Sequence, residues 1–375
     1  MKIAVNTRLL IKNEIDGIGK FTLESFKHIV KQNPQHQFIF IFDRKPHPDF
    51  IFAKNIEAIT ISPQARHPIL YKIWYQFSLK KLLKIIKPDI FVATDGMIPL
   101  NTETKTLSVV HDLNFVHHPK HLPTALRNYY CKYFPKFTNK ADRIATVSEF
   151  SKSDLIKTYG INESKIDVVY NGADDGFKPI SEDEKIATKL KYTNNKDYFL
   201  FVGTLHPRKN LVNLFNAFDE FKTSTKSDFK LLIVGKKMWW TDEIQSTYNK
   251  LNHKNDIIFT GRVQETELYK ITASAYALTY IPIFEGFGIP LVEAMSCGVP
   301  VITSNVTSMP EVVESAGILV DPFSVQEITD ALVKISENSY YKNQLSEKSL
   351  IQAKKFSWQK TGGLLWESIN KTINA

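Results

Sequence analysis

The sequence predicts an α/β protein made of two doubly wound domains, each built on a parallel β-sheet. Short apolar runs alternate with helix-length amphipathic segments along the whole chain, which is the order that parallel strands with helical crossovers produce. With 375 residues, of which 43% are hydrophobic and 23% charged, the chain can form two domains of ordinary size, each with its own core. Alternation, length and composition therefore agree on the fold class.

The expected strands are short runs rich in apolar and β-branched residues. In the first half of the chain they lie at 2–6, 37–42, 56–61, 89–94, 106–110, 143–147 and 166–170. In the second half they lie near 198–203, 230–235, 256–260, 276–281, 299–303 and 317–320. The segments between them carry the helical spacing of apolar residues, so we expect helices on both faces of each sheet.

A polar, charged stretch separates the two sets of strands. It runs from Asn171 to Asp197 and contains the turn-forming dipeptides Asn-Gly and Asp-Gly, which interrupt regular structure. We expect a first domain over 1–173, a linker over 174–197 and a second domain over 198–355. Ligands of such sheets bind beyond the carboxyl ends of the strands. We therefore expect the two domains to face each other across a cleft that holds the functional site.

The last segment, about 356–375, has the pattern of a helix. Its apolar stripe consists of Trp358, Leu364, Leu365, Trp366 and Ile369. An apolar stripe of this kind has to be buried against another element, and we expect the helix to pack back on the first domain.

The composition points away from several classes of protein. No apolar run approaches the ~20 residues that span a bilayer, and the N-terminus begins as a strand without a signal-peptide pattern. Two cysteines, Cys131 and Cys297, make no disulfide framework, and no His/Cys cluster has zinc spacing. We expect a cytoplasmic protein without a metal or other bound cofactor.

Positive charge is concentrated in two stretches without acidic residues, 62–88 and 113–140. The net charge is +9, which favours anionic partners. The basic residues of the two stretches are Arg66, Lys72, Lys80, Lys81, Lys84, Lys87, Lys120, Arg127, Lys132, Lys136 and Lys140. Basic residues among aromatic ones suit an anionic membrane surface or a polyanionic substrate, but a core helix with a solvated basic face fits equally well. No nucleic-acid-binding motif is present, so we expect no nucleic-acid partner.

A Gly-rich turn between two glutamates is the most informative segment. It follows the strand expected at 276–281, and Glu285 and Glu293 stand on either side of the turn. Gly286 and Gly288 would let the backbone approach a ligand, and the start of the next helix would offer free N–H groups to an anion. Carboxylates accept hydrogen bonds from hydroxyls. The segment therefore suits a nucleotide sugar, although plain strand-to-helix connections can share its pattern.

Two adjacent cations follow the strand expected at 198–203. Arg208 and Lys209 stand at the mouth of a predicted helix, where they would neutralise a diphosphate together with the helix N-terminus. The alternative is that Asn210 merely caps the helix while the two cations are solvated.

Weaker signals follow other strands. Gly17 and Gly19 precede a helical run and could bring backbone amides to a phosphate or sugar, but the third glycine of a dinucleotide fingerprint is missing. His111 follows the strand at 106–110 and could hydrogen-bond a sugar hydroxyl, unless it is structural and Asp112 caps the next segment.

Two further segments follow strands of the second half. The backbone at Val263 could contact a nucleobase, and Glu311 is expected to be a helix-start carboxylate rather than a ligand-binding group.

Taken together, these segments resemble the retaining glycosyltransferases of family 4, which have the GT-B fold of two Rossmann-like domains. The resemblance is carried by 202–211 and 284–300, and further by 147–151, 170–172, 309–312 and 316–322. It extends over nearly the whole chain in order. It implies a metal-independent hexosyltransferase that uses a nucleoside-diphosphate sugar in the synthesis of cell-surface polysaccharide or lipopolysaccharide.

The resemblance also implies roles for single residues. Glu285 and His111 would lie near the transferred sugar, and Arg208 and Lys209 would stabilise the departing diphosphate; these four would be the catalytic residues. Glu293 would accept hydrogen bonds from the ribose. The remaining donor contacts would come from Gly17, Gly19, Gly203, Thr204, Val263, Gly286, Phe287, Gly288 and Ile289. The first glycine loop lacks the Gly-Gly opening of the family, which leaves its first contact in question.

The family's chemistry implies retention of the anomeric configuration, with the departing phosphate taking the acceptor's proton. GDP-mannose or a UDP-hexose would be the donor, and a glycan or lipid-linked glycan the acceptor. The enzyme would be cytoplasmic or peripheral on the inner face of the plasma membrane. Two alternatives stay open: another GT-B enzyme, such as a sugar-nucleotide epimerase, and a two-domain sugar-binding protein without catalysis. Paired carboxylates would also permit a glycosidase, but the leaving-group chemistry of the family disfavours it.

Overall fold

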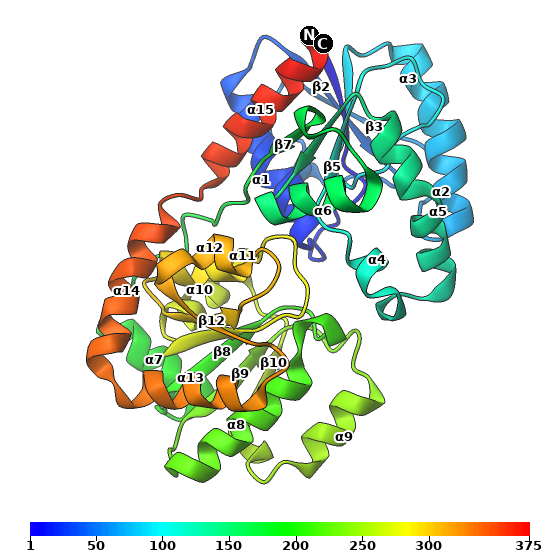
Figure 1. Ribbon diagram of the computed structural model, residues 1–375. Coiled ribbons are helices and arrows are strands. Elements are labelled where there is room, and N and C mark those ends of the chain that lie inside the picture. The colour runs from blue at the N-terminus through cyan, green and yellow to red at the C-terminus, as the bar shows by residue number, and fades with distance from the viewer. The chain divides into compact units, whose positions relative to one another are not determined.

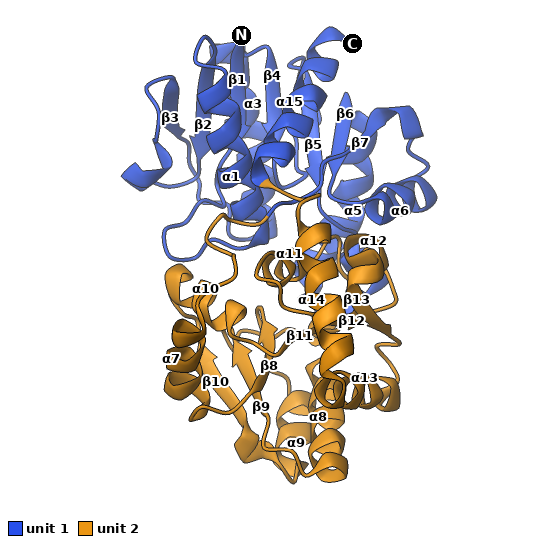
Figure 2. Cartoon of the chain, turned by 90° about the vertical axis from the view of Figure 1, so that its left-hand side faces the viewer, with its two compact units in different colours: residues 1–172, 358–375 blue, residues 173–357 orange.

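The computed structural model describes all residues from Met1 to Ala375 and divides the chain into two compact units (Figure 2). Unit 1 comprises Met1–Gly172 and Trp358–Ala375, and unit 2 comprises Ala173–Ser357. The segment 174–197, which we expected to be a linker, instead belongs to unit 2 and carries helix α7 (Glu182–Thr193). Its capping box joins Ser181 and Glu184 reciprocally, so the Ser-x-x-Glu pattern should have indicated a helix start.

Unit 1 contains a seven-stranded parallel sheet in the order β3-β2-β1-β4-β5-β6-β7. The strands are β1 (Lys2–Asn6), β2 (Gln37–Phe42), β3 (Ile56–Thr60), β4 (Ile90–Ala93), β5 (Thr106–Val110), β6 (Arg143–Thr146) and β7 (Ile166–Val168). Each expected strand is present, with its ends within two residues of the prediction. The order reverses between β1 and β4, and in doubly wound sheets such a reversal marks the place where ligands bind.

The helices of unit 1 lie around this sheet (Figure 1). They are α1 (Gly17–Gln32), α2 (Pro68–Ile73), α3 (Lys80–Ile86), α4 (Asn114–His117), α5 (Thr124–Lys140), α6 (Glu149–Tyr159) and α15 (Trp358–Asn374), with a π-helical stretch η2 (Trp74–Leu79) and the 3-10 turns η1 (Pro48–Phe50), η3 (Pro119–His121) and η4 (Glu163–Lys165). Interior packing is aromatic: Phe26 of α1 meets Phe38 and Phe40 of β2 edge-on, with ring centroids 6.4 and 5.9 Å away.

Helix α15 returns the end of the chain to unit 1, where it lies along α1 (Figure 1). The Trp366 ring stacks on His36, with ring centroids 5.5 Å apart. The Ser368 hydroxyl donates to Asp167 Oδ2 at 2.7 Å, and Lys105 Nζ donates to the Ile373 carbonyl at 2.7 Å. Of its apolar stripe, Trp358, Leu365 and Ile369 are buried and Leu364 and Trp366 are half-buried, so the helix packs on the first unit as expected.

Unit 2 contains a six-stranded parallel sheet in the order β10-β9-β8-β11-β12-β13. The strands are β8 (Tyr198–Val202), β9 (Lys230–Val234), β10 (Ile257–Gly261), β11 (Ala277–Tyr280), β12 (Val301–Ser304) and β13 (Gly317–Val320). Again every expected strand is present. The order reverses between β8 and β11, which are the two strands that precede the cationic loop and the Gly-rich turn.

The helices that complete unit 2, besides α7, are α8 (Leu211–Thr225), α9 (Asp242–Lys250), α10 (Glu265–Ala273), α11 (Ile289–Ser296), α12 (Met309–Val313), α13 (Val325–Glu337) and α14 (Ser339–Ala353), with the 3-10 turns η5 (Pro207–Lys209), η6 (Lys254–Asp256) and η7 (Glu314–Ala316). In neither unit is any helix long and apolar enough to cross a membrane.

Candidate active site

The two loops that follow β8 and β11 meet at the point where the strand order of unit 2 reverses. The backbone N–H of Ile283 donates to the Arg208 carbonyl at 2.9 Å, which ties the loops together. Asn210 adopts a left-handed backbone conformation at φ 62°, and its side-chain amide donates to the Pro322 carbonyl at 2.6 Å. Asn210 therefore fixes the cationic loop through Pro322 and does not cap α8 with its side chain.

Three charged side chains converge between these loops. Arg208 and Lys209 both contact the same oxygen, Oε1, of Glu285. Lys209 also donates to the Tyr280 hydroxyl, and its Nζ lies 4.6 Å from the centre of that ring. Lys209 and Glu285 are each only 8% exposed. Two cations against one carboxylate leave a positive cluster, and its burial strengthens its attraction for an anion.

The turn after Glu285 depends on a glycine. Gly288 has a φ of +89°, and a Cβ there would lie 2.9 Å from Met309 Cε and 3.1 Å from Leu291 Cδ1. The Ser308 hydroxyl holds the turn from the neighbouring loop by donating to the Glu285 carbonyl at 3.0 Å. Gly288 is the N-cap of α11 and, having no side chain, caps none of the N–H groups of the first turn, in which only Pro290 lacks an N–H. The turn thus presents backbone N–H groups at a helix start, as an anion site requires.

The remaining predicted residues of the turn are largely buried. Gly286 and Phe287 are buried, Ile289 is half-buried, and the Phe287 ring packs edge-on against Phe356 at 5.5 Å between centroids. Glu293 lies on α11 and is 6% exposed. Burial, reinforced by the Glu293 charge, raises the pKa of the Cys297 thiol well above its usual range. A carboxylate buried to this extent has to be hydrogen-bonded, which constrains the orientation of Glu293.

Backbone hydrogen bonds connect the loops after β8, β9 and β10. Gly203 N–H donates to Val234 at 2.9 Å, and Gly235 N–H donates to Gly261 at 2.9 Å. Gly235 has a φ of +152°, and a Cβ there would lie 1.8 Å from the Gly203 carbonyl oxygen. Any side chain at position 235 would therefore displace the Gly203 backbone.

Thr204 and Val263, the outer members of the predicted donor-binding set, lie on the same edge of the sheet. Thr204 is exposed after β8, and Val263 is half-buried after β10, two strands away from β8. Their predicted roles as donor contacts rest on this position at the edge of the sheet.

In unit 1, the predicted glycine loop at Gly17 and Gly19 is capped by the side chain of Asp16. Helix α1 begins at Gly17, and the Asp16 carboxylate accepts a hydrogen bond from the Gly19 N–H at 2.8 Å. Gly17 is exposed and Gly19 is buried. The Gly19 amide is therefore already used as a helix-cap donor, whereas we expected it to approach a ligand.

His111 is half-buried at the carboxyl end of β5. Its Nε2 lies 2.9 Å from the Thr94 carbonyl oxygen, and its ring meets Phe21 edge-on at 5.1 Å between centroids. A carbonyl oxygen can only accept, so Nε2 carries the proton and Nδ1 of the neutral ring is an acceptor. Burial lowers the pKa of His111. Asp112 accepts a hydrogen bond from Asn114 N–H at 3.0 Å, so it caps the next turn as the alternative interpretation foresaw.

Several residues at these edges were not predicted from the sequence, and it is the structure that reveals them. In unit 2 they are Tyr280, which contacts Lys209, and Ser308, which contacts Glu285. In unit 1 they form a buried group in which Arg8 Nε donates to Asp95 Oδ2 at 2.7 Å and to the Tyr75 hydroxyl at 2.8 Å. Arg8 and Asp95 both follow neighbouring strands, β1 and β4, and that position was the available signal.

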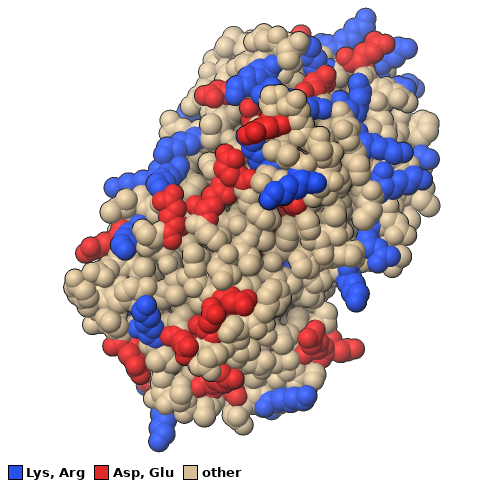
Figure 3. All heavy atoms as spheres, in the orientation of Figure 1, with Lys and Arg blue, Asp and Glu red and all other residues tan.

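A basic and apolar surface covers α2, η2 and α3 of unit 1, and we call it the basic flank. Its exposed apolar side chains are Ile69, Ile73, Phe77 and Ile85, at 65%, 39%, 63% and 68% exposure. Its exposed cations are Arg66, Lys72, Lys80, Lys81, Lys84 and Lys87. Figure 3 shows Lys and Arg along the side of unit 1 where Figure 1 places α2 and α5, with acidic side chains among them only near the top of the view, where α3 lies.

Comparison with known proteins agrees with this architecture. The family described as Glycosyltransferase Family 4 matches residues 15–177, and that described as Glycosyl transferases group 1 matches residues 182–352. O-antigen chain mannosyltransferase B of Escherichia coli is 28% identical over 379 residues, which cover 97% of each chain.

Solved structures share the fold over almost the full length. WaaG, described as a glycosyltransferase involved in lipopolysaccharide biosynthesis, superposes with a TM-score of 0.79 at 16% identity, covering 96% of this chain and 97% of that chain. Anabaena HepE, solved in complex with UDP-glucose, gives a TM-score of 0.77 at 17% identity, covering 99% of this chain and 100% of that one.

Two parallel-sheet, Rossmann-like units with these structural neighbours define a GT-B fold. The chain belongs to the family 4 glycosyltransferases, described also as glycosyl transferases group 1, and the protein is a glycosyltransferase.

Proposed function

We propose that this glycosyltransferase moves a hexose of the mannose type from a nucleoside-diphosphate sugar to a hydroxyl of a glycan or lipid-linked glycan. The observation that carries the proposal is the buried contact of Arg208 and Lys209 with Glu285. It lies where the strand order of the unit 2 sheet reverses. The name of the E. coli relative supports mannosyl transfer in O-antigen synthesis, and the UDP-glucose complex of HepE supports a nucleotide-sugar donor.

The donor would bind at the carboxyl edge of the unit 2 sheet. Its diphosphate would contact Arg208 and Lys209, which now share the Glu285 carboxylate, and the N–H groups at the start of α11. Glu293 would accept from the ribose, while the backbone at Val263 would contact the base. The arriving phosphate would compete with Glu285 for the two cations. Glu285, released from one or both of them, would then be available to the sugar hydroxyls.

Catalysis would depend on stabilising the departing diphosphate. Negative charge grows on the phosphate as the bond to the anomeric carbon breaks, and oriented cations in a buried site stabilise that charge without reorganising. We propose that the configuration is retained, with the departing phosphate taking the acceptor's proton, and that the neutral His111 accepts a hydroxyl hydrogen bond through Nδ1. Arg208 and Lys209 would supply the positive charge that a metal ion supplies in other transferases, so activity should survive EDTA.

The acceptor side is proposed to be unit 1, working at an anionic membrane surface on the cytoplasmic side. Exposed Ile69, Phe77 and Ile85 beside lysines form the combination that inserts apolar groups among anionic headgroups. A lipid-linked acceptor would be presented by the same surface. GDP-mannose is our first choice of donor because of the mannosyltransferase relative, and a UDP-hexose is the second.

Thermal unfolding with a panel of nucleoside diphosphates and nucleotide sugars tests the donor site. A ligand that binds only the folded state at about 100 times its Kd stabilises by about 2.7 kcal/mol. GDP and GDP-mannose should stabilise the wild type, and Lys209→Met and Glu293→Gln should lose most of the effect. Lys250→Met and Glu347→Gln, exposed residues of α9 and α14, are the matched controls.

Product analysis completes the test. Proton NMR of the product formed from GDP-mannose should show an α-mannosyl linkage, the configuration of the donor. If only UDP compounds stabilise the protein, the donor is a UDP-hexose and not GDP-mannose. A β-linked product would show that the anomeric configuration is not retained. Conversion of the nucleotide sugar without any acceptor would favour an epimerase instead.

A further inference from the structure

A second pocket lies in unit 2 at the opposite edge of its sheet from the candidate active site. Its walls come from α7, α14, the residues before β8 and β11, and the turn between α11 and β12. These are the amino ends of the strands, whereas the cationic loop and Gly-rich turn follow the carboxyl ends. The cavity measures about 420 Å³, within the range of about 300 to 1,000 Å³ that is common for small-molecule sites.

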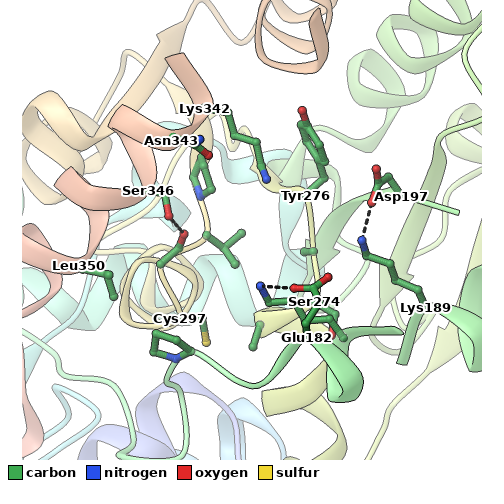
Figure 4. Close-up of a pocket in the computed structure, with 17 residues that line it drawn as sticks. Glu182, Lys189, Asp197, Ser274, Tyr276, Cys297, Lys342, Asn343, Ser346 and Leu350 are labelled. Atoms are coloured by element: carbon green, nitrogen blue, oxygen red, sulfur yellow. Dashed lines mark hydrogen bonds and ion pairs between the residues drawn. The ribbon is translucent and has the colours of Figure 1, made fainter. Parts of the chain in front are cut away.

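Three lysines face this pocket, but only two have carboxylate partners. Lys189 Nζ lies 2.6 Å from Asp197, and Lys185 Nζ lies 3.2 Å from Glu182 (Figure 4). Lys342, from the first turns of α14, contacts no carboxylate; its Nζ lies over the Tyr276 ring, 4.2 Å from the ring centre. The pocket walls thus carry three positive and two negative charges, and the unpaired one belongs to Lys342.

The position of Lys342 is costly without an anion. Burial lowers the pKa of Lys342, and the positive charges of Lys185 and Lys189 add to this effect, while Asp197 opposes it. A desolvated ammonium gains from a charged partner more than an exposed one does. Asp197 and Glu182 act on Lys342 from a distance, but each forms its ion pair with another lysine, so a bound anion would give Lys342 a direct partner.

The rest of the lining suits a polar ring next to the anion. Ser274 is 3% exposed, and its hydroxyl has no hydrogen-bond partner of good geometry. Ser346 lines the pocket with a hydroxyl that donates to the Gly298 carbonyl. Tyr276, Pro300 and Leu350 supply apolar surface. Aromatic and apolar walls with a few hydroxyls and one charged residue are the usual lining of a small-molecule site.

We propose that this pocket binds a small phosphorylated ligand of sugar-phosphate size, with the phosphate on Lys342 and the ring against Tyr276. No bond is made or broken there. The site is separate from the donor site, so its occupancy does not require glycosyl transfer and the proposal stands or falls independently of the proposed function.

Calorimetric titration of the full-length protein with glucose 6-phosphate, inorganic phosphate and glucose tests the proposal. Glucose 6-phosphate should bind more tightly than either of the other two. Lys342→Met, which removes the charge but keeps the stem, should weaken it by about 10- to 100-fold, the effect of losing a hydrogen bond to a charged group. Lys342→Arg should retain binding, and Lys348→Met, an exposed lysine of the same helix, should leave it unchanged.

One further variant and one stability measurement make the outcome unambiguous. Lys209→Met should bind glucose 6-phosphate as the wild type does; if Lys209→Met alone loses binding, the phosphate occupies the candidate active site and the proposal is wrong. Equal binding by Lys342→Met and wild type, or no binding by the wild type at millimolar concentrations, also overturns it. The unfolding midpoint of Lys342→Met should equal or exceed that of the wild type, which excludes misfolding as the cause of a loss.

Discussion

Unit 2 and unit 1 place their functional cations in opposite ways. Lys209 in unit 2 is 8% exposed and is held against Glu285 and Tyr280, whereas the lysines of the basic flank in unit 1 are exposed beside Phe77 and Ile85. Buried, oriented cations act strongly on one small anion, while exposed cations are screened and act together on an extended surface. This difference matches what we propose for the two units, a donor site in unit 2 and a membrane-binding surface on unit 1.

Loss of the buried cation should have the largest effect on catalysis. Lys209→Met should lower kcat/KM by about 10²- to 10³-fold, or about 2.7–4 kcal/mol of transition-state stabilisation, by the scale of a lost oxyanion-hole donor. Steady-state kinetics would measure this, with Lys250→Met of α9 as the control. A decrease in kcat/KM of less than threefold would mean that the cluster around Glu285 is structural. The buried cations of unit 2 would then not be the donor site.

The backbone support of the cluster can be tested through Gly235. Gly235→Ala should destabilise unit 2 by about 3 kcal/mol, because the added Cβ would lie 1.8 Å from the Gly203 oxygen and φ is +152°. Chemical denaturation would measure the loss. Gly363→Ala in α15, where a Cβ meets nothing within 4 Å, should instead stabilise unit 1 by about 0.5–1 kcal/mol. If the two variants change the free energy of unfolding equally, the loops after β8 and β9 can move to accept a side chain at position 235.

The basic flank should lose vesicle binding when its apolar side chains are removed. Phe77→Ser should weaken binding to vesicles containing phosphatidylglycerol by about 10- to 100-fold, since a fully buried apolar side chain contributes about 1.5–3 kcal/mol. Leu190→Ser, at a residue 63% exposed on α7 of unit 2, is the control. Sedimentation of the two variants with vesicles at low and high salt would decide. If the wild type does not sediment with these vesicles at low salt, the basic flank does not bind membranes and the proposal for unit 1 is wrong.

The second glutamate should affect affinity more than rate. Glu293→Gln should raise the Kd for the nucleoside diphosphate by about 10- to 150-fold, with kcat changed less, because a charge-assisted hydrogen bond to a ribose hydroxyl contributes about 1.5–3 kcal/mol in both ground and transition states. Glu347→Gln on α14 should change neither. A loss of kcat alone would place Glu293 near the reacting sugar instead and would sharpen the division of roles within unit 2.

The smallest expected effect is a pH dependence in unit 1. Burial lowers the pKa of His111, so the unfolded chain binds its proton more readily, and the stability contributed by the neutral ring is lost as the pH falls from about 6.5. Protonation would also remove Nδ1 as an acceptor, so kcat/KM should decline in the same acidic range. His111→Gln should flatten this limb, while His36→Gln should leave it in place. An unchanged limb in His111→Gln would assign the titration elsewhere.

Much of the fold could be predicted from the sequence because strand and helix patterns are local. All strands of both sheets were expected within two residues of their ends. The segment 174–197 was the exception, because its turn-forming residues predict a linker, whereas the capping box of Ser181 and Glu184 starts helix α7. The resemblance to family 4, carried by short segments, gave roles to candidate residues that the sequence had already indicated, and it added Gly203, Thr204, Phe287 and Ile289.

The sequence by itself determined the alternation of strands and helices, the two-unit organisation, and the placing of Arg208, Lys209 and Glu285 directly after strands. Only the tertiary structure decided that Lys209 contacts both Glu285 and Tyr280. It also decided that the Gly19 amide donates to Asp16, and that Lys342 lies over a tyrosine ring without a carboxylate partner. The physical reason is range. Backbone periodicity is fixed by neighbours in the chain, whereas the contacts of a charged side chain depend on which distant loops the strand order brings together.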